Sequence, residues 1–249
     1  ALPICEARLA TVIGAPGVGK TRIARELARS VADGTRTFEV RCERSGTATF
    51  APIADLLRTA AGADDDDDAD AVTASIRDLV GDAPDADRLV DLLGSFVGTT
   101  EPRSTEDTFF AARRLLEVRG AATPLLVTID DIQWAEPLLL DLLEHVASWE
   151  RSAPVTVLVL ARPELREIRP ALAQPGKRVA DVVSLEGLDA GATEELAAEL
   201  LGGAGLPSEL TERLPASTDG NPLFVRELVR MLVDDGVIEP GGDGGWLLA

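Results

Sequence analysis

Tyrosine is absent from this chain of 249 residues, which also has only three tryptophans and six phenylalanines. The hydrophobic core must therefore be built from leucine, valine, isoleucine and alanine. Two cysteines, Cys5 and Cys42, give neither zinc-ligand spacing nor a disulfide framework, and the single histidine, His145, belongs to no catalytic pattern. The sequence has no signal-peptide pattern and no apolar run near the ~18 residues that span a membrane. These absences favour a cytoplasmic protein in a reducing setting.

Positive charge is also scarce, with 24 basic against 43 acidic residues and a formal net charge of −19. Such a surface repels nucleic acids and anionic membranes, so we expect no direct nucleic-acid or membrane binding by this segment. The run Asp64–Asp68, followed by Asp70, admits a metal site or a solvated loop. Consecutive carboxylates do not converge on one ion, and the glycine spacing of a calcium loop is missing. A solvated loop leading into a helix N-terminus is the favoured interpretation.

Lysine occurs only twice, as Lys20 and Lys177. A GC-rich genome would account for this scarcity, although not for the position of Lys20. That residue lies in a glycine-rich segment, Gly14-Ala15-Pro16-Gly17-Val18-Gly19-Lys20-Thr21, which fits the phosphate-binding loop pattern. Backbone N–H groups of such a loop surround nucleotide phosphates, and the lysine reaches the β- and γ-phosphates as a compact charge. We include the loop and the following Arg22 among the predicted nucleotide-binding residues.

Hydrophobic patterns predict alternating strands and helices. Apolar runs predict strands over 8–13, 37–42, 125–129, 155–160 and 179–185. Segments with helical periodicity predict a helix from about residue 19, one over 50–60, two short ones within 72–97, one after Ser104 and one over 138–146. This order predicts an α/β fold, a P-loop NTPase three-layer sandwich with a mainly parallel sheet. Three further helices are predicted: one over 190–201 capped by Asp189, one over 207–216 opened by Pro207, and one over 222–235 that Asn221-Pro222 caps and starts. They indicate a small helical domain. We therefore expect an α/β domain over 1–186, a helical domain over 187–240 and, over 241–249, the start of a truncated following segment.

A second candidate motif for nucleotide binding lies at the end of the predicted strand Leu125–Ile129, which is followed by Asp130 and Asp131. An apolar strand ending in two carboxylates is the Walker B arrangement. It would place Asp130 to hold Mg²⁺ together with Thr21. Asp131 would orient or deprotonate the water that attacks the γ-phosphate. Two acids at a strand end could also be ordinary turn residues, but the upstream phosphate loop favours the functional interpretation.

Three segments carry a family resemblance. Asp130–Glu136, with the sequence Asp-Asp-Ile-Gln-Trp-Ala-Glu, closely resembles the signature of STAND-class signalling ATPases, a branch of AAA-type P-loop proteins found in large ATP-binding LuxR-type regulators and bacterial multidomain adenylate cyclases. Val157–Glu164 resembles the strand of that family that ends in a sensor arginine. Asp219–Leu228 resembles its "GNPLF" helical motif. The resemblance covers nearly the whole chain.

The resemblance implies further roles. Arg162 would sense the γ-phosphate; the alternative is that it is a surface arginine after a strand. Pro222 would pack near the adenine, and it could also be simply the first residue of a helix. Trp134 would pack beneath the site, and Gln133 would help to position water. The family also carries a hydrophobic-Gly-Arg-Glu segment before the loop that helps to seat the adenine, and this sequence does not match it.

These observations predict an ATP-binding, slowly hydrolysing switch domain with ATP or ADP and Mg²⁺ as ligands. Its expected partners are effector and sensor domains of the same parent chain, such as a transcription regulator or cyclase, and it could form a nucleotide-dependent oligomer. One alternative is a scaffold module that holds nucleotide without hydrolysis. A nucleoside kinase is disfavoured by the paired carboxylates, and a DNA-loading ATPase by the net charge of −19.

Overall fold

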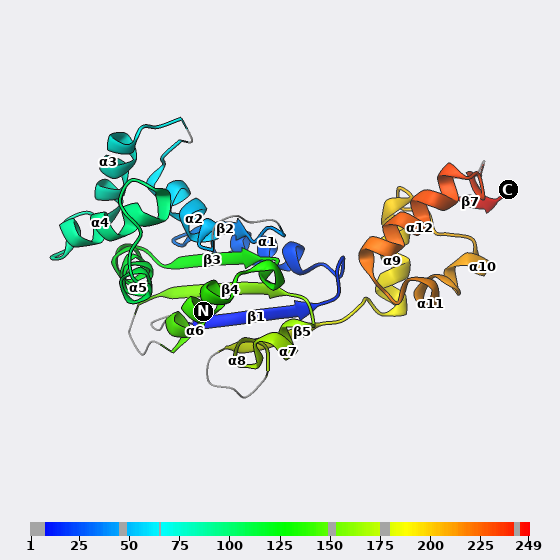
Figure 1. Cartoon of the computed structure of the whole chain (residues 1–249). Coiled ribbons are helices and arrows are strands. Elements are labelled where there is room, and N and C mark those ends of the chain that lie inside the picture. Colours follow the sequence, from blue (N-terminus) through cyan, green and yellow to red (C-terminus); the bar gives the residue numbers. More distant parts are fainter. Residues whose placement is uncertain (1–7, 45–48, 65, 149–152, 175–179, 242–244) are drawn as a thin grey trace. The chain divides into compact units, whose positions relative to one another are not determined.

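The computed structural model describes all residues except 1–7, 45–48, 65, 149–152, 175–179 and 242–244 (Figure 1). It divides into two compact units, each considered separately below. The sheet unit comprises residues 1–13 and 21–183, and the helical unit comprises residues 14–20 and 184–249. The predicted division at residues 186 and 240 stays a prediction, but the helical unit includes a segment of the phosphate loop that the sequence alone assigned to the α/β part.

A five-stranded sheet forms the centre of the α/β fold. Its strands lie in the order β2 (Arg36–Arg41), β3 (Leu125–Asp130), β4 (Val155–Ala161), β1 (Arg8–Gly14) and β5 (Asp181–Leu185). The pairings β2–β3, β3–β4 and β1–β4 are parallel, with Val157 opposite both Leu9 and Val127. Because parallel strands end at one edge, the carboxyl ends of β2, β3 and β4 lie together there.

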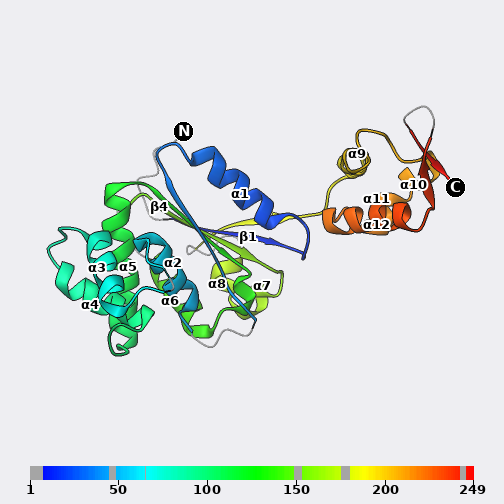
Figure 2. The ribbon, with the colours of Figure 1, turned by 90° about the horizontal axis from the view of Figure 1, so that it is seen from above.

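Helices cover both faces of the sheet, which explains why β3 and β4 are almost wholly buried. Figure 2 shows α1 (Lys20–Val31) on one side of the sheet and α5 (Thr105–Ala122) and α6 (Pro137–Ala147) on the other. The main core joins strand residues to α6 and to the short helices α7 (Leu165–Ile168) and α8 (Pro170–Ala173). The observed fold confirms the predicted α/β sandwich with a parallel sheet.

A second core lies among α2 (Ala51–Ala61), α3 (Ala69–Val80), α4 (Ala86–Val97) and α5. Its centre is fully buried, at Leu57, Ile76, Leu89 and Leu93. The acidic run leads into this cluster, where the carboxylate of Asp68 accepts a hydrogen bond from the Ala71 N–H (2.9 Å) and caps α3. The predicted helix N-terminus after the acidic run is therefore confirmed.

The helical unit contains α9 (Ala190–Leu200), α10 (Ser208–Thr211), α11 (Leu214–Thr218) and α12 (Pro222–Asp234). Its small core is formed by apolar side chains of α9, α11 and α12 together with Ile238. The strands β6 (Ile238–Pro240) and β7 (Trp246–Leu248) form an antiparallel hairpin, and Trp246 packs against this core.

The structure differs from the sequence-based expectations at two places in the helical unit. The helix predicted over 207–216 is two short helices, because the chain breaks between Thr211 and Leu214 before Pro215. The short strand β6 was not predicted. The helix predicted from about residue 19 is confirmed as α1, in which the side chains of Ile23 and Leu27 are 44% and 37% exposed. Residues 242–244 of the predicted following segment, over 241–249, lie outside the described residues.

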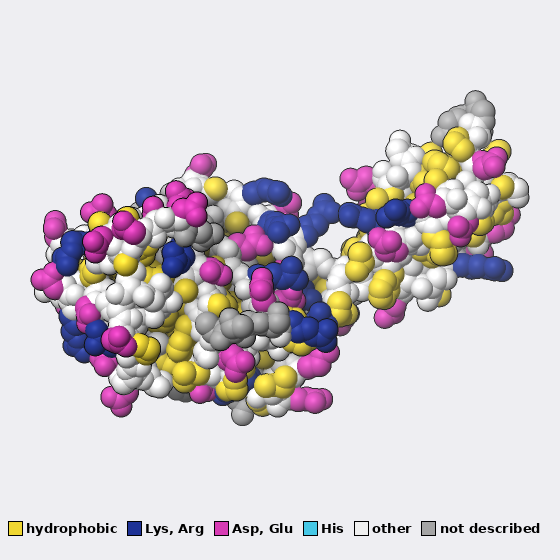
Figure 3. Space-filling model, turned by 45° about the horizontal axis from the view of Figure 1, so that its top comes forward, with side chains coloured by type: hydrophobic (Ala, Val, Ile, Leu, Met, Phe, Trp, Pro, Cys, Tyr) yellow, Lys and Arg dark blue, Asp and Glu magenta, His cyan; other side chains and the backbone are white. Residues whose placement is uncertain are grey.

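The surface carries charges of both signs. On the face shown in Figure 3, acidic side chains are spread over the sheet unit and are interspersed with basic ones. Within the described residues, the helices are too short or too polar to cross a membrane.

Candidate functional site

The phosphate loop joins the end of β1 to the start of α1, and two glycines give it its shape. Gly17 and Gly19 have φ values of 79° and 108°, which residues with a Cβ atom rarely adopt. The Lys20 ammonium is buried against the loop and donates to the carbonyl oxygens of Gly14 (2.9 Å) and Ala15 (3.0 Å). The loop is therefore folded around its own lysine.

An asparagine of the helical unit contacts this loop. Asn221 is buried, and its Nδ2 donates to the carbonyl oxygen of Pro16 at 2.8 Å. Its Oδ1 accepts from the Leu223 N–H at 3.0 Å, which caps α12. The Asn-Pro pair predicted the cap, but the contact spans 205 residues and has no local sequence signal.

Asp130 is the last residue of β3, and both of its carboxylate oxygens accept hydrogen bonds. Its Oδ2 accepts from the Thr21 hydroxyl at 2.7 Å, and its Oδ1 accepts from the Asp131 N–H at 2.7 Å. Its carbonyl accepts from the Cys42 N–H at 2.9 Å, which ties the ends of β3 and β2 together. The predicted metal-ligand pair, Thr21 and Asp130, is therefore in direct contact, and Thr21 follows Lys20 directly in the chain. A hydroxyl beside a carboxylate suits Mg²⁺, which usually takes one or two protein ligands and completes its shell with phosphate and water oxygens.

Asp131 lies one residue further, in the left-handed conformation with φ at 55°. Arg41, at the end of β2, forms an ion pair with its Oδ2, with Nε at 2.8 Å, and Gln133 Nε2 donates to its Oδ1 at 2.7 Å. Burial pushes the pKa of Asp131 upward, but the hydrogen bonds from Gln133 and Arg41 and the charges of Arg41 and Arg162 outweigh it. The pKa of Asp131 is therefore lower than usual. Sequence reasoning missed Arg41, whose position at a strand end beside β3 becomes evident only with the strand order.

Arg162 follows β4 and is linked to the same network. Its backbone N–H donates to Gln133 Oε1 at 3.2 Å. Its guanidinium lies 5.4 Å from the ring centre of Trp134, and that of Arg44 lies 4.6 Å from it. Such cation–π contacts hold a long side chain in place. Gln133 therefore joins the carboxylate of Asp131 to the start of the segment after β4.

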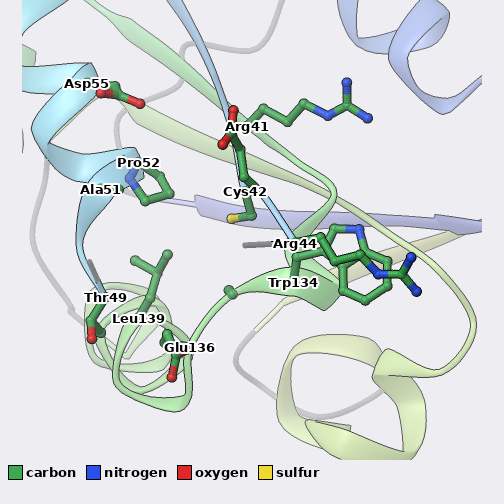
Figure 4. A pocket seen from close by; sticks show the side chains of 12 residues that line it. Arg41, Cys42, Arg44, Thr49, Ala51, Pro52, Asp55, Trp134, Glu136 and Leu139 are labelled. Carbon is green, nitrogen blue, oxygen red and sulfur yellow. The ribbon is translucent and has the colours of Figure 1, made fainter. Parts of the chain in front are cut away.

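Each unit contains a cavity. That of the sheet unit, about 180 Å³, lies beside Trp134 and Cys42, and Figure 4 shows the Cys42 sulfur directed into it between α2 and the segment before α6. Burial, followed by the charges of Asp131 and Asp130, raises the pKa of the Cys42 thiol to about 12, so this thiol stays protonated at neutral pH. The cavity of the helical unit, about 610 Å³, is lined by Ala15 and Val18 of the loop, by residues 185–188, and by residues of 215–224 that include Phe224.

The remaining predicted residues lie as follows. Arg22 is exposed on α1, and Pro222 is the half-buried first residue of α12. His145 is exposed on α6, where its ring centre lies 5.5 Å from that of Phe109. Neither Arg22 nor Pro222 lines the larger cavity.

A parallel sheet whose first strand leads through a glycine-rich loop into a helix defines a P-loop nucleoside triphosphatase fold. The chain belongs to the AAA ATPase domain family, whose model matches residues 3–160. That match includes Lys20, Thr21, Asp130 and Asp131. A second family model, described only as a domain of unknown function, matches residues 190–240. A search of curated proteins found no match to the chain.

Proposed function

We propose that this chain is an ATP-binding and slowly hydrolysing switch domain of the STAND class. The observation that carries the proposal is the contact of Thr21 with Asp130, followed immediately by a second carboxylate, Asp131. A hydroxyl after the phosphate loop and a carboxylate at the end of β3 are the two protein groups that a nucleotide-bound Mg²⁺ requires. The AAA family membership supports nucleotide binding independently.

In this proposal the loop N–H groups and Lys20 bind the phosphates, while Thr21 and Asp130 hold Mg²⁺. The bound ion would offset the negative charge of the β- and γ-phosphates. Asp131 orients water and accepts its proton, for which its lowered pKa keeps it ionised at neutral pH. Both Asp131 oxygens already accept hydrogen bonds from Arg41 and Gln133, which supports slow turnover, because the base must exchange a partner before it can hold water.

The cavity of about 610 Å³ in the helical unit is the proposed seat of the nucleoside, with Pro222 in its neighbourhood. Loop residues form one of its walls and Phe224 contributes an aromatic side chain, as suits a base beside a polyphosphate. Arg162 is proposed to sense the γ-phosphate. The state of the nucleotide would then be read by effector and sensor domains of the parent chain, such as a DNA-binding regulator or a cyclase, or by an oligomer.

Two variants test this function. Lys20→Ala should abolish ATP and ADP binding in calorimetry, since it removes the charge that the loop encloses. Asp131→Asn should bind ATP like the parent and release no phosphate in a coupled assay. Unchanged ATP affinity in the Lys20 variant would refute the site assignment.

The engagement of Asp131 by Arg41 also favours a second candidate, a module that binds nucleotide without hydrolysing it. Phosphate release separates the two functions. A parent protein that binds ATP and Mg²⁺ but releases phosphate no faster than the Asp131→Asn variant has the scaffold function.

A further inference from the structure

Asn221 uses both ends of one side-chain amide. Its Oδ1 accepts from the Leu223 N–H and caps α12, and its Nδ2 donates to the carbonyl of Pro16, within the phosphate loop. A helix cap needs only the oxygen, which serine or aspartate supplies equally well. Capping therefore does not explain the contact of the amide nitrogen with the loop.

The contact of Asn221 with Pro16 fixes the orientation of one peptide group in the loop. The peptide between Pro16 and Gly17 is planar, and its C=O and N–H point in opposite directions. Because Asn221 holds the Pro16 carbonyl oxygen at 2.8 Å, it also directs the Gly17 N–H away from α12. A phosphate loop works by aiming its N–H groups at the phosphates, so the direction of this peptide decides whether one donor is available.

The position of Asn221 is itself fixed by its neighbours. Asp219 and Gly220, just before it, both adopt left-handed conformations, with φ at 50° and 63°. The Gly220 carbonyl accepts from the Leu188 N–H at 2.8 Å, and a Cβ on Gly220 would lie 2.1 Å from the Leu188 carbonyl oxygen. The turn that presents Asn221 is therefore held by a close backbone contact that leaves no space for a side chain.

The same region packs directly on the loop. A Cβ on Gly17 would lie 2.5 Å from the Cβ of Leu223 and 2.9 Å from Oδ1 of Asn221. The first turn of α12 therefore lies against the peptide whose orientation matters. A displacement of this turn would release the Pro16 carbonyl and free the peptide to rotate.

We propose that Asn221 is a positioning residue that orients the Pro16–Gly17 peptide for phosphate binding and links nucleotide retention to the start of α12. The inference rests on the proposed nucleotide binding and extends it to a residue outside the loop. Because coupling is reciprocal, bound phosphate also favours the arrangement in which α12 holds the loop.

Four variants separate capping from loop orientation. Asn221→Ser keeps an uncharged cap but is too short to reach Pro16, whereas Asn221→Ala removes both functions. Asp189→Ala removes the cap of α9, where Asp189 accepts from the Ala192 N–H at 2.8 Å in the same unit, and serves as the matched control. Lys20→Ala is the control without nucleotide binding. Each is measured for dissociation of a fluorescent ADP analogue and for melting temperature without nucleotide.

We expect ADP analogue release to accelerate about fivefold in both Asn221 variants, the change that follows from the loss of one neutral hydrogen bond. The melting temperature should fall most in Asn221→Ala, which loses both hydrogen bonds, and less in Asn221→Ser and Asp189→Ala, which each lose one. Parental release by Asn221→Ser, or equal acceleration by Asp189→Ala, would overturn the inference while leaving the proposed function intact. If the parent and Lys20→Ala bind the analogue alike, the proposed function fails and the inference fails with it.

Discussion

At the residue scale, the arrangement around Asp131 depends on charges that meet only in the folded protein. Arg41, Gln133 and Asp131 come from the ends of two neighbouring strands and the turn after one of them. The arginine is mostly exposed, so its contribution to stability is small. Together with the hydrogen bond from Gln133, its contact with the partly buried carboxylate lowers the pKa of Asp131 against the opposing effect of burial. This contact is open to a test by pH.

Arg41→Gln should raise the pKa of Asp131, because it removes a hydrogen-bond donor and a positive charge. The native pKa is depressed, so the stabilisation is present above the unfolded value near 3.8 and is lost as the pH falls through the native pKa. Melting temperatures measured between about pH 3 and pH 7 should therefore separate parent from variant near neutrality and converge in acid.

Arg25→Gln serves as the control for this measurement. Arg25 of α1 pairs at 3.3 Å with Glu39, which lies on β2 like Arg41, so this variant removes an exposed ion pair of the same strand without changing the partner of Asp131. A constant offset between parent and Arg41→Gln at every pH would show that the ion pair does not act through Asp131.

Gly17→Ala should destabilise the protein through contact as well as conformation. Its φ of 79° strains any side chain, and the new Cβ would meet Leu223 at 2.5 Å. Gly34→Ala is a matched control, since Gly34 has a similar φ of 89° and open space around its Cβ position. Urea unfolding should show about 1–3 kcal/mol more destabilisation for Gly17→Ala than for Gly34→Ala. Equal losses would mean that α12 yields to the added methyl group.

At the element scale, apolar runs and N-cap residues in the sequence predicted several strands and helix starts correctly. The apolar runs of β3 and β4 are buried strands, and Ser104, Asp189 and Asn221 cap the helices that they were expected to begin. The predictions were wrong where tertiary context decides. The segment 207–216, predicted as one helix, forms two short helices.

The candidate site shows the same division. Thr21, Asp130 and Asp131 could be found from the sequence, because each follows a strand or loop with a recognisable pattern. Arg41 and Asn221 could not, since their partners lie 90 and 205 residues away and neither belongs to a local pattern with that partner. Side chains that join distant segments are set by packing, which the sequence pattern does not describe.

Ser104→Ala tests the strength of one such cap. Ser104 Oγ accepts from the Asp107 N–H at 3.2 Å at the start of the 18-residue helix α5. We expect a loss of about 1 kcal/mol in the free energy of unfolding, the usual value for an N-cap. Ser30→Ala is the control, because that hydroxyl donates to the Leu27 carbonyl of its own helix and alanine favours helix. Chemical denaturation of both variants measures the difference, and a loss as large in Ser30→Ala would argue against a specific cap.

At the scale of the whole molecule, the net charge of −19 opposes compaction. Exposed ion pairs such as Arg77–Asp87 contribute little, so repulsion among the excess carboxylates dominates the response to salt. The melting temperature should rise as sodium chloride increases from about 10 mM to about 150 mM, over which the Debye length falls from roughly 25–30 Å to about 8 Å. A neutral osmolyte at matched osmolarity controls for solvent effects, and a falling melting temperature in salt would mean that attractive pairs dominate.

The grouping of residues 14–20 with residues 184–249 has a consequence for how such chains can recombine. A chimera junction after residue 183 follows the boundary between the two units in the second half of the chain. It would nevertheless take Asn221 and Leu223 from one parent and their contacts, the Pro16 carbonyl and Gly17, from the other. A C-terminal segment taken from a related protein would therefore have to match a loop inherited from the other parent. In evolution, as in chimera design, the phosphate loop and the first turn of α12 should be exchanged together or not at all.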